Sequence, residues 1–437
     1  MKDSIDPIGM LFGARGWKPH QFQRDTWRAY AGGHSGLLHA PTGLGKTLAV
    51  WMGPVAEALL ETEEPKTCRV LWLTPLRALA QNTVDSLSAP LDELGSGMEV
   101  GSRTGDTSSY RRAKLRDKLP FALVTTPESL SLMLTYEDSR QKLSDLRCVI
   151  IDEWHELIGS KRGVQTELCL ARLRRWVPKL RTWGVSATLG NLKEARDVLL
   201  GTDSEGSVLI DSRQQRPIEV TTMVPVSVDR FPWGGHLGLG MIKRVVEALR
   251  QGGSTLVFTN TRSQTEIWHQ ALLDADPSLK RRIAVHHGSL SREARSETEH
   301  RLMNGDLLAV VCTSSLDLGL DFSSIDQVIQ IGSPKGVARL LQRAGRSGHG
   351  PGRVPRLCCV PTNALELLEF AAARDAMEAG EIESRRPLIQ PLDVLVQHIT
   401  SCSIGERIAE SALFQEVRST YAFRNLTTSE WGWVLDF

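Results

Sequence analysis

Short apolar runs alternate with longer amphipathic stretches through the first half of the chain. Runs of this length predict strands that are buried on both faces of a sheet. Because the stretches between them have the apolar spacing of helices, the pattern predicts a parallel sheet covered by helices. The runs read GLLHA, RVLWLTP, FALVTTP, RCVIIDE and TWGVSATL.

The same alternation restarts near residue 254, with the runs STLVFTN, RIAVHHG, LLAVVCT and QVIQIG. The stretch between the two series is broken by Pro217, Pro225 and Pro232 and by the pair Gly234 and Gly235. A chain of 437 residues also exceeds what one hydrophobic core usually supports. We therefore predict two α/β domains, residues 1–213 and 214–385.

A sequence with helical spacing, ALELLEFAAARDAMEAG, follows the second series and ends at Gly380. We expect this helix to complete the second domain. The apolar pattern of residues 386–437 is too short and incomplete for a full domain of its own. This segment is expected to be the beginning of a third domain that is cut off.

Composition narrows the class of protein without identifying it. Hydrophobic residues make up 41% and charged residues 24%, which is typical of a folded globular protein. A net charge of +1 neither favours nor excludes nucleic acid, because a binding groove needs only local basic charge. No apolar run has the length of a membrane span and no signal peptide is evident, so we expect a cytoplasmic protein. The seven cysteines form no CxxC pair and are expected to be buried thiols.

Residues 40–47 read APTGLGKT, between a predicted strand and a predicted helix. This is the context of a phosphate-binding loop, in which glycines let backbone amides approach phosphate oxygens. Lys46 would carry positive charge to the phosphates, and the Thr47 hydroxyl would bind Mg²⁺. The first position is Ala40, where the strict motif has glycine. The predicted ATP-binding residues of the loop are Thr42, Gly43, Leu44, Gly45, Lys46 and Thr47.

A second candidate element is the run VIIDEWH, which delivers Asp152 and Glu153 at the carboxyl end of a predicted strand. Open α/β sheets bind ligands at that end. Asp152 is expected to bind Mg²⁺, directly or through water. Glu153, pointing elsewhere by strand alternation, suits the base that activates an attacking water.

The second domain offers the run LQRAGRSGH, residues 341–349. A guanidinium there suits a finger that stabilises charge on a transferred phosphate, and Arg346 is the first choice, with Arg343 as an accessory. Taken alone, the run is also typical of a basic surface turn.

These motifs together resemble those of superfamily-two helicases of the DEAH/DExH type. The resemblance covers residues 17 to about 400. Within the superfamily the chain most resembles the Lhr-like (large helicase-related) group, and especially its ligase-associated DEXH-box branch, which has the DEWH form of motif II seen at residues 152–155. It implies two tandem RecA-like lobes with an ATP cleft between them, followed by the start of a winged-helix domain. His349 stands where many members of the superfamily have a second arginine finger.

The resemblance also assigns residues by position. Gln23 is similar to the glutamine that reads adenine, and Gly319 and Asp321 lie in motif V, near the nucleotide. Ser186 and Thr188 of motif III, with His155, are expected to couple the ATP site to the strand. The residues expected to line the nucleic-acid track are Thr74, Arg77, Gly105, Thr126 and Thr313.

The function implied is ATP- and Mg²⁺-dependent movement along single-stranded DNA, 3′ to 5′, in bacterial DNA repair. By resemblance, a DNA ligase or nuclease is an expected partner, a monomer suffices, and the location is the bacterial cytosol or nucleoid. Two alternatives stay open. One is an RNA-dependent ATPase, because the motifs do not separate RNA from DNA by physics. The other is a nucleic-acid-binding fragment that is inactive without further domains.

Overall fold

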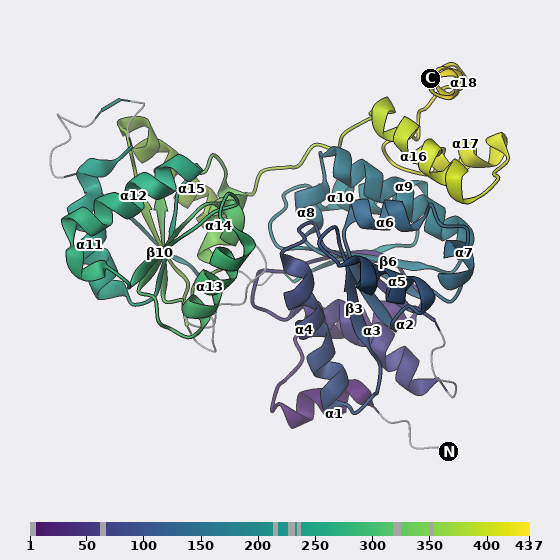
Figure 1. Cartoon of the computed structure of the whole chain (residues 1–437), viewed down its shortest axis with the longest axis horizontal. Coiled ribbons are helices and arrows are strands. Elements are labelled where there is room, and N and C mark those ends of the chain that lie inside the picture. Colours follow the sequence, from purple (N-terminus) through teal and green to yellow (C-terminus); the bar gives the residue numbers. More distant parts are fainter. Residues whose placement is uncertain are drawn as a thin grey trace. The chain divides into compact units, whose positions relative to one another are not determined.

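The computed structural model describes residues 6–61, 67–212, 217–225, 232–233, 237–317, 325–348 and 353–437. These residues form two compact units. Residues 1–40, 44–213 and 384–437 belong to the first unit, and residues 41–43 and 214–383 belong to the second. Each unit has its own sheet with helices packed on both faces (Figure 1). Gly319, Asp321 and His349, singled out from the sequence, lie outside the described residues.

The first sheet has seven strands in the order β3-β4-β2-β5-β6-β1-β7, and every neighbouring pair is parallel. Each of the five strands predicted from apolar runs is present, which confirms the predicted α/β class. The strands are β1 (Gly36–His39), β2 (Val70–Leu73), β3 (Val100–Arg103), β4 (Ala122–Thr125), β5 (Cys148–Ile151), β6 (Arg181–Ser186) and β7 (Val208–Asp211).

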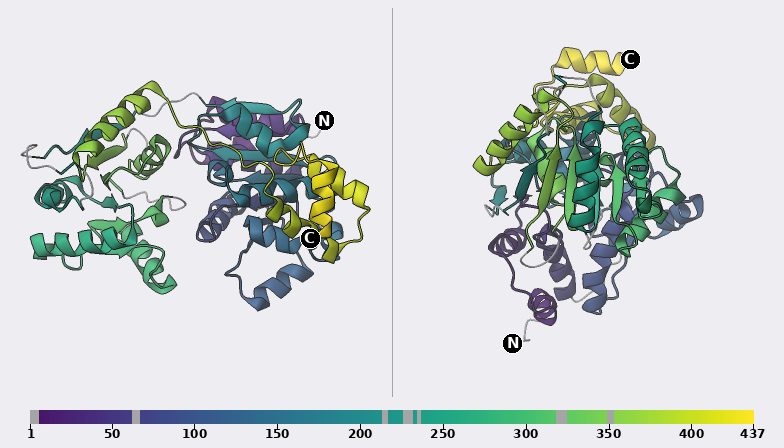
Figure 2. Two further views of the ribbon diagram at one scale, coloured as in Figure 1. Left: turned by 90° about the horizontal axis from the view of Figure 1, so that it is seen from above. Right: turned by 90° about the vertical axis from the view of Figure 1, so that its left-hand side faces the viewer.

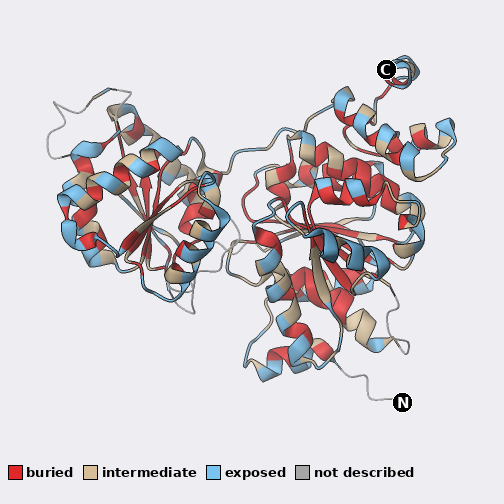
Figure 3. Ribbon diagram, viewed as in Figure 1, coloured by how far each residue is buried: buried red, intermediate tan, exposed pale blue. Residues whose placement is uncertain are grey.

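Successive residues of the central strands point into two different cores, one on each face of the first sheet. Leu71, Val149 and Ile151 belong to one core, whereas Trp72 and Ile150 belong to the other. This is why the runs contain no alternation of apolar and polar residues: both faces of the sheet are covered. Figure 3 shows these strands as buried almost throughout.

The helices of the first unit divide between the two faces. One core is completed by residues of α6 and α8–α10, and the other by residues of α1–α4. The helices are α1 (Pro7–Ala14), α2 (Gln21–Ala31), α3 (Lys46–Leu60), α4 (Leu79–Glu93), α5 (Ser109–Asp117), α6 (Pro127–Met133), α7 (Ser139–Lys142), α8 (Trp154–Leu157), α9 (Lys161–Trp176) and α10 (Leu192–Leu200), with a 3₁₀ turn at Gly201–Asp203.

The second sheet has six parallel strands in the order β10-β11-β9-β12-β13-β8. Its central strands again send alternate residues to two cores: Leu256 and Phe258 lie in one, Val257 in the other. The strands are β8 (Glu219–Thr222), β9 (Thr255–Phe258), β10 (Ile283–His286), β11 (Ala309–Cys312), β12 (Gln327–Ile331) and β13 (Arg356–Val360).

The helices of the second unit include the one predicted from ALELLEFAAARDAMEAG, which is α15 and ends at Gly380 in a left-handed conformation. The other four helices of the described residues lie between strands along the chain. The helices of this unit are α11 (Ile242–Gly252), α12 (Arg262–Ala275), α13 (Arg292–Met303), α14 (Val337–Ala344) and α15 (Ala364–Ala379), with 3₁₀ turns at Leu239–Met241, Pro277–Leu279 and Ser314–Leu316.

The C-terminal segment contains three helices, α16 (Leu392–Gly405), α17 (Glu410–Arg418) and α18 (Thr428–Asp436). α16 and α17 pack against α9 of the first unit, and α18 packs against α16. Its own small core includes Leu395 and Phe423 together with Val164 and Leu168 of α9. Figure 2 shows these helices, drawn in yellow, against the helices of the first unit. Within the described residues, no helix combines the length and apolarity that crossing a bilayer requires.

Candidate active site

The predicted phosphate-binding loop connects β1 to the N-terminus of α3, as its sequence context indicated. Gly43 and Gly45 both have a left-handed backbone, with φ of 79° and 81°. That conformation is costly for residues with a Cβ, so the glycines allow the loop to curl before the helix. Lys46 is the first residue of α3, and the N-terminal end of a helix favours an anion through its macrodipole.

Gln23, predicted to read adenine, is buried and bonded within the protein. Its Nε2 donates to Gly45 O at 3.1 Å, and its Oε1 accepts from His20 N at 2.8 Å. The side chain therefore joins the cap of α2 to the last residue of the loop before α3. Its position beside the loop agrees with a role at the nucleotide, but its amide already serves to fix the loop.

The two predicted acids lie in a turn directly after β5. The strand ends at Ile151, so the prediction that strand alternation separates Asp152 from Glu153 is wrong. Instead, Glu153 has a left-handed backbone, with φ and ψ both 46°, and it caps α8. Such a conformation costs a non-glycine residue about 1 kcal/mol. It reverses the chain so that both carboxylates stay at the carboxyl end of the sheet.

Electrostatics in this turn favours a cation. Burial raises the pKa of Asp152 well above its ordinary value, the charge of Glu153 raises it further, and Lys46 opposes the shift. One Asp152 oxygen accepts from Glu153 N at 2.9 Å. The Oε2 atom of Glu153 is buried and accepts no hydrogen bond from the described residues. Two acids are thus held together at a site where their repulsion is only partly compensated.

These residues fit a bound Mg²⁺ ion. Mg²⁺ prefers oxygen ligands, and the Asp152 carboxylate and the Thr47 hydroxyl, each predicted as a ligand, are of that kind. A divalent cation would also offset the negative charge that raises the pKa of Asp152.

His155 joins the acidic turn to the end of β6. It is buried, and its Nδ1 lies 3.1 Å from Ser186 Oγ and 3.6 Å from Glu153 Oε2. Burial lowers the pKa of the imidazole, so the neutral form is favoured there. Thr188, two residues beyond Ser186, is buried as well. The geometry therefore connects the predicted base to the predicted coupling motif through one side chain.

Four of the predicted track residues follow the carboxyl ends of β2, β3 and β4, which are neighbours in the sheet. Thr74 and Thr126 are buried, and the Thr126 hydroxyl accepts from Ser129 N as the cap of α6. Arg77 is about half exposed and pairs with Asp106 at 3.4 Å. A Cβ on Gly105 would come within 2.6 Å of the Arg77 guanidinium carbon, so a larger residue there would displace the end of the Arg77 side chain.

Thr313, the fifth predicted track residue, follows β11 in the second unit. Its backbone N donates to His286 O at 3.2 Å. The side chain of His286 is buried and lies 2.8 Å from Ser315 Oγ and 2.9 Å from Glu299 Oε1. His286 therefore holds the turn that carries Thr313.

Arg343, predicted as an accessory finger, is a buried anchor of the second unit. Its Nε donates to Asp317 at 2.7 Å, its Nη1 donates to Gln330 at 2.5 Å, and its guanidinium lies over Phe258. Arg346, the predicted principal finger, is also mostly buried, and its backbone N donates to Arg343 O at 2.9 Å. Arg343 thus fixes the start of the turn that carries Arg346.

Some residues of the motifs were missed as individual sites. Asp317 stands within the sequence that indicated motif V, and its partnership with Arg343 was not predicted. The ion pair of Arg162 with Glu128, which joins α9 to α6, was not predicted either. Residues of opposite charge were the available signal, but sequence spacing does not show which of them meet.

Comparison with known families assigns three consecutive regions. The family model for DEAD/DEAH box helicases matches residues 20–195, and that for the helicase conserved C-terminal domain matches residues 240–350. The winged-helix model of large helicase-related proteins matches residues 375–437. The RecA-like sheets and the winged-helix region expected from the sequence are thereby confirmed.

Similar proteins extend the match along nearly the whole chain. ATP-dependent helicase Lhr-Core of Saccharolobus solfataricus is 34% identical over 92% of this chain and 47% of its own length. The Lhr helicase/uracil glycosylase of Escherichia coli is 32% identical over the whole chain and 33% of its own length. The chain thus spans about half the length of the Lhr-Core relatives and less of the longer Lhr proteins.

Solved structures agree with this assignment. The Mycobacterium smegmatis helicase Lhr, bound to single-stranded DNA and AMP-PNP, is 32% identical with a TM-score of 0.88, over 99% of this chain and 58% of that one. The helicase MrfA, bound to DNA, shares the fold with a TM-score of 0.79. Motifs, fold and relatives lead to one conclusion: the chain belongs to the Lhr-like helicases of superfamily two.

Proposed function

We propose that this chain is the motor part of an ATP-driven helicase that moves along single-stranded DNA. The observation that carries the proposal is the arrangement at the ends of β1, β5 and β6. There the loop with Lys46, the acids Asp152 and Glu153, and the His155–Ser186 contact belong to neighbouring strands of one sheet. A relative of 32% identity that was solved with single-stranded DNA and AMP-PNP supports both ligands.

Each group of the site has a proposed role in ATP hydrolysis. Amides of the loop and Lys46 would hold the phosphates of ATP, and Thr47 and Asp152 would hold Mg²⁺, which when bound would offset phosphate charge. Glu153 Oε2 orients the attacking water and accepts its proton. Arg346 stabilises charge on the transferred phosphate, while Arg343 acts as a positioning residue through its ion pair with Asp317. Gly319 and Asp321 are proposed near the nucleotide by position in motif V alone.

Movement requires that hydrolysis of the nucleotide change the position of the residues that bind the strand. His155 contacts both Glu153, the proposed general base, and Ser186. Loss of the γ phosphate beside Glu153 would therefore alter the end of β6 through His155. Arg77, half exposed in a weak surface ion pair, exchanges Asp106 for a backbone phosphate at little cost. Thr74, Gly105 and Thr126 are proposed to bind the strand beside Arg77, and Thr313 of the second unit is proposed as a strand contact by family resemblance. These residues would contact the phosphates of the strand and not its bases, which suits a motor that moves on any sequence.

Narrower features of the function rest on family resemblance. We infer 3′ to 5′ movement, a role in DNA repair beside a ligase or nuclease, action as a monomer, and residence in the bacterial cytosol or nucleoid. The DEWH form of motif II supports the ligase-associated branch and the preference for DNA over RNA.

Displacement of streptavidin from biotinylated single-stranded DNA tests the proposed movement. The chain should displace streptavidin from the 5′ end of an oligonucleotide with ATP present, and much more slowly from the 3′ end. The Glu153→Gln variant is the matched control, because it retains the strand contacts and lacks the base. Equal displacement by the wild type and this variant would reject the motor.

A further inference from the structure

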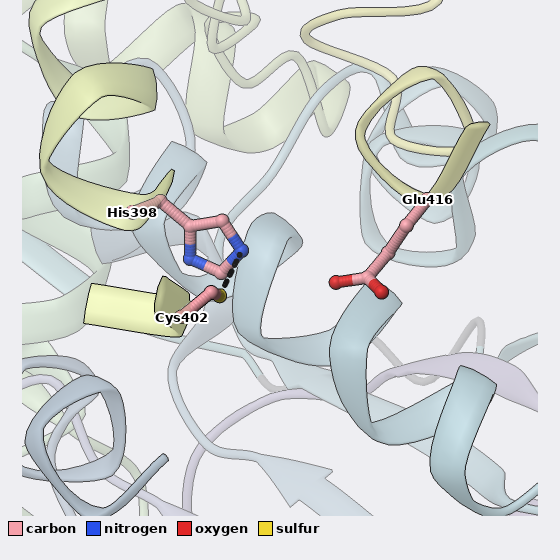
Figure 4. Close-up of side chains that lie close together, drawn as sticks. All are labelled: His398, Cys402 and Glu416. Atoms are coloured by element: carbon pink, nitrogen blue, oxygen red, sulfur yellow. Dashed lines mark hydrogen bonds between the residues drawn. The ribbon is translucent and has the colours of Figure 1, made fainter. Parts of the chain in front are cut away.

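A group of three potential metal ligands lies in the C-terminal segment, apart from the candidate active site. His398 and Cys402 are one turn apart on α16, and Glu416 extends from α17 toward them (Figure 4). His398 Nε2 and Cys402 Sγ are 3.4 Å apart. One ligand atom from each of the three residues lies within 4.8 Å of the other two.

The three side chains are buried, at 3%, 2% and 6% exposure for His398, Cys402 and Glu416. Burying a carboxylate costs free energy unless each oxygen has a partner. One oxygen of Glu416, Oε2, accepts from Arg172 Nη1 at 3.0 Å. The other, Oε1, is buried and accepts no hydrogen bond from the described residues. A metal ion is a partner that would satisfy this oxygen.

The charged groups around the site approach only one oxygen of Glu416. Arg172 of α9 lies 3.0 Å from Glu416 Oε2 and 3.0 Å from Glu406, and Arg175 lies 3.7 Å from the same Oε2. Glu406 is also paired with Arg140, at 2.9 Å. Among the described residues these arginines leave Glu416 Oε1 without a charged partner, and a divalent ion bound to one carboxylate and one thiolate would be locally neutral.

We propose that His398, Cys402 and Glu416 bind one Zn²⁺ ion that fixes α16 and α17 against α9. A sulfur, an imidazole nitrogen and a carboxylate oxygen are the ligand types that zinc takes, whereas Mg²⁺ and Ca²⁺ prefer oxygen alone. Arg172, bonded to the far oxygen of Glu416, orients the ligating carboxylate.

The separation of the ligands suits tetrahedral zinc. A sulfur and a nitrogen bound to one zinc ion at about 2.3 and 2.1 Å lie about 3.6 Å apart. Cys402 Sγ and His398 Nε2 share a hydrogen bond at 3.4 Å, so exchange of its proton for zinc needs only a small change in their separation. In the proposed site Glu416 Oε1 takes the third position and water takes the fourth.

Zinc binds cysteine as the thiolate and histidine as the neutral imidazole. On binding, the S–H proton of Cys402 is released to solvent while a sulfur lone pair forms the Zn–S bond.

Metal analysis of the wild-type chain is the first test. Incubated with Zn²⁺ and dialysed, the chain should retain about one zinc per molecule, and removal of the zinc by a chelator should lower its melting temperature. Substitution with Co²⁺ should give the near-ultraviolet sulfur-to-cobalt band and the intense visible bands of a tetrahedral site. A dialysed wild-type chain that retains no zinc and shows no such bands would overturn the proposal.

Variants identify the ligands. The Cys402→Ser and Glu416→Gln chains should each lose the retained zinc, and Cys402→Ser should also lose the sulfur-to-cobalt band. Cys358→Ser is the matched control, because Cys358 lies in β13 of the second unit and should not affect the bands. Circular dichroism verifies that each variant is folded. Folded Cys402→Ser protein with an unchanged sulfur-to-cobalt band would reject the assignment.

Discussion

Ser186 Oγ lies 3.1 Å from Nδ1 of His155, so one hydrogen bond joins the last residue of β6 to the turn that carries Asp152 and Glu153. Both partners are buried, and a bond between buried groups depends strongly on its geometry. In the proposed motor, this hydrogen bond transmits the structural change that follows hydrolysis from the acidic turn to the end of β6.

Ser186→Ala should separate hydrolysis from movement. The variant loses the hydroxyl that meets His155 and retains Lys46, Asp152 and Glu153. We expect ATP turnover within about threefold of the wild type, whereas DNA translocation per ATP falls by tenfold or so. Parallel measurement of phosphate release and streptavidin displacement gives this ratio. An unchanged ratio would remove the coupling role of the contact.

Glu153→Gln should separate binding from chemistry. The amide cannot accept the proton of the attacking water, so hydrolysis should fall by about a hundredfold or more while ATP and DNA binding persist. Lys46→Ala should weaken ATP binding itself, because it removes charge from the phosphate loop. Fluorescent nucleotide titration with steady-state turnover distinguishes the two, and wild-type turnover in either variant would refute the site.

Arg343 and Arg346 should fail in different ways when replaced by alanine. Arg343→Ala removes the close partner of the buried Asp317 carboxylate, which retains only the more distant Arg339, and should destabilise the second unit by about 3–5 kcal/mol. Arg346→Ala should lower turnover with little change in ATP affinity, since a finger acts on charge in the transition state.

The control for this comparison is Arg339→Ala. Arg339 lies 3.8 Å from the same Asp317 and is largely exposed, so its loss should change melting temperature and turnover little. If Arg343→Ala melted like the wild type and Arg346→Ala hydrolysed ATP at full rate, both assigned roles would be wrong.

Docking of the C-terminal segment should depend on pH through Glu167. Burial raises the pKa of this α9 carboxyl from 4.5 to about 8, although its Oε2 accepts from Ala422 N at 2.9 Å. A carboxyl whose pKa is raised in the fold binds more protons folded than unfolded between these values. Stability from this group is therefore full below about pH 4.5 and is lost as pH rises toward 8.

Glu167→Gln retains an acceptor for Ala422 and does not titrate. The melting temperature of this variant, compared with the wild type, should rise from pH 5 to pH 8. Exposed Glu381, replaced by glutamine, provides a control whose melting curve should follow the wild type at every pH. A difference between Glu167→Gln and the wild type that stayed constant with pH would contradict the burial argument.

The sequence predicted the strands whose side chains are buried on both faces. Runs such as VLWL and CVII are continuous because two cores cover β2 and β5. Strands β3, β7 and β8 lie at sheet edges and are only partly buried. β3 and β8 carry polar or small residues and contain no apolar run, whereas the short run VLI of β7 was not identified as a strand. The run RLCCV of β13, which lies between Pro355 and Pro361, was not identified as a strand.

The candidate site was predictable as far as it is local in sequence. Lys46 and Asp152 could be singled out because the loop and the strand end that carry them are each recognisable from a few consecutive residues. The left-handed turn at Glu153, the His155–Ser186 bond and the burial of Arg343 depend on long-range packing. No spacing rule gives such contacts, and strand alternation gave the wrong reason for the position of Glu153.

Steady-state ATP hydrolysis by this chain, with no nucleic acid, with single-stranded DNA and with single-stranded RNA at one fixed salt concentration, tests the central claim most directly. The proposed motor predicts strong stimulation by DNA, weaker stimulation by RNA, and loss of both in Glu153→Gln. Equal or greater stimulation by RNA would make it an RNA helicase, and no hydrolysis under any condition would contradict a motor contained in these residues.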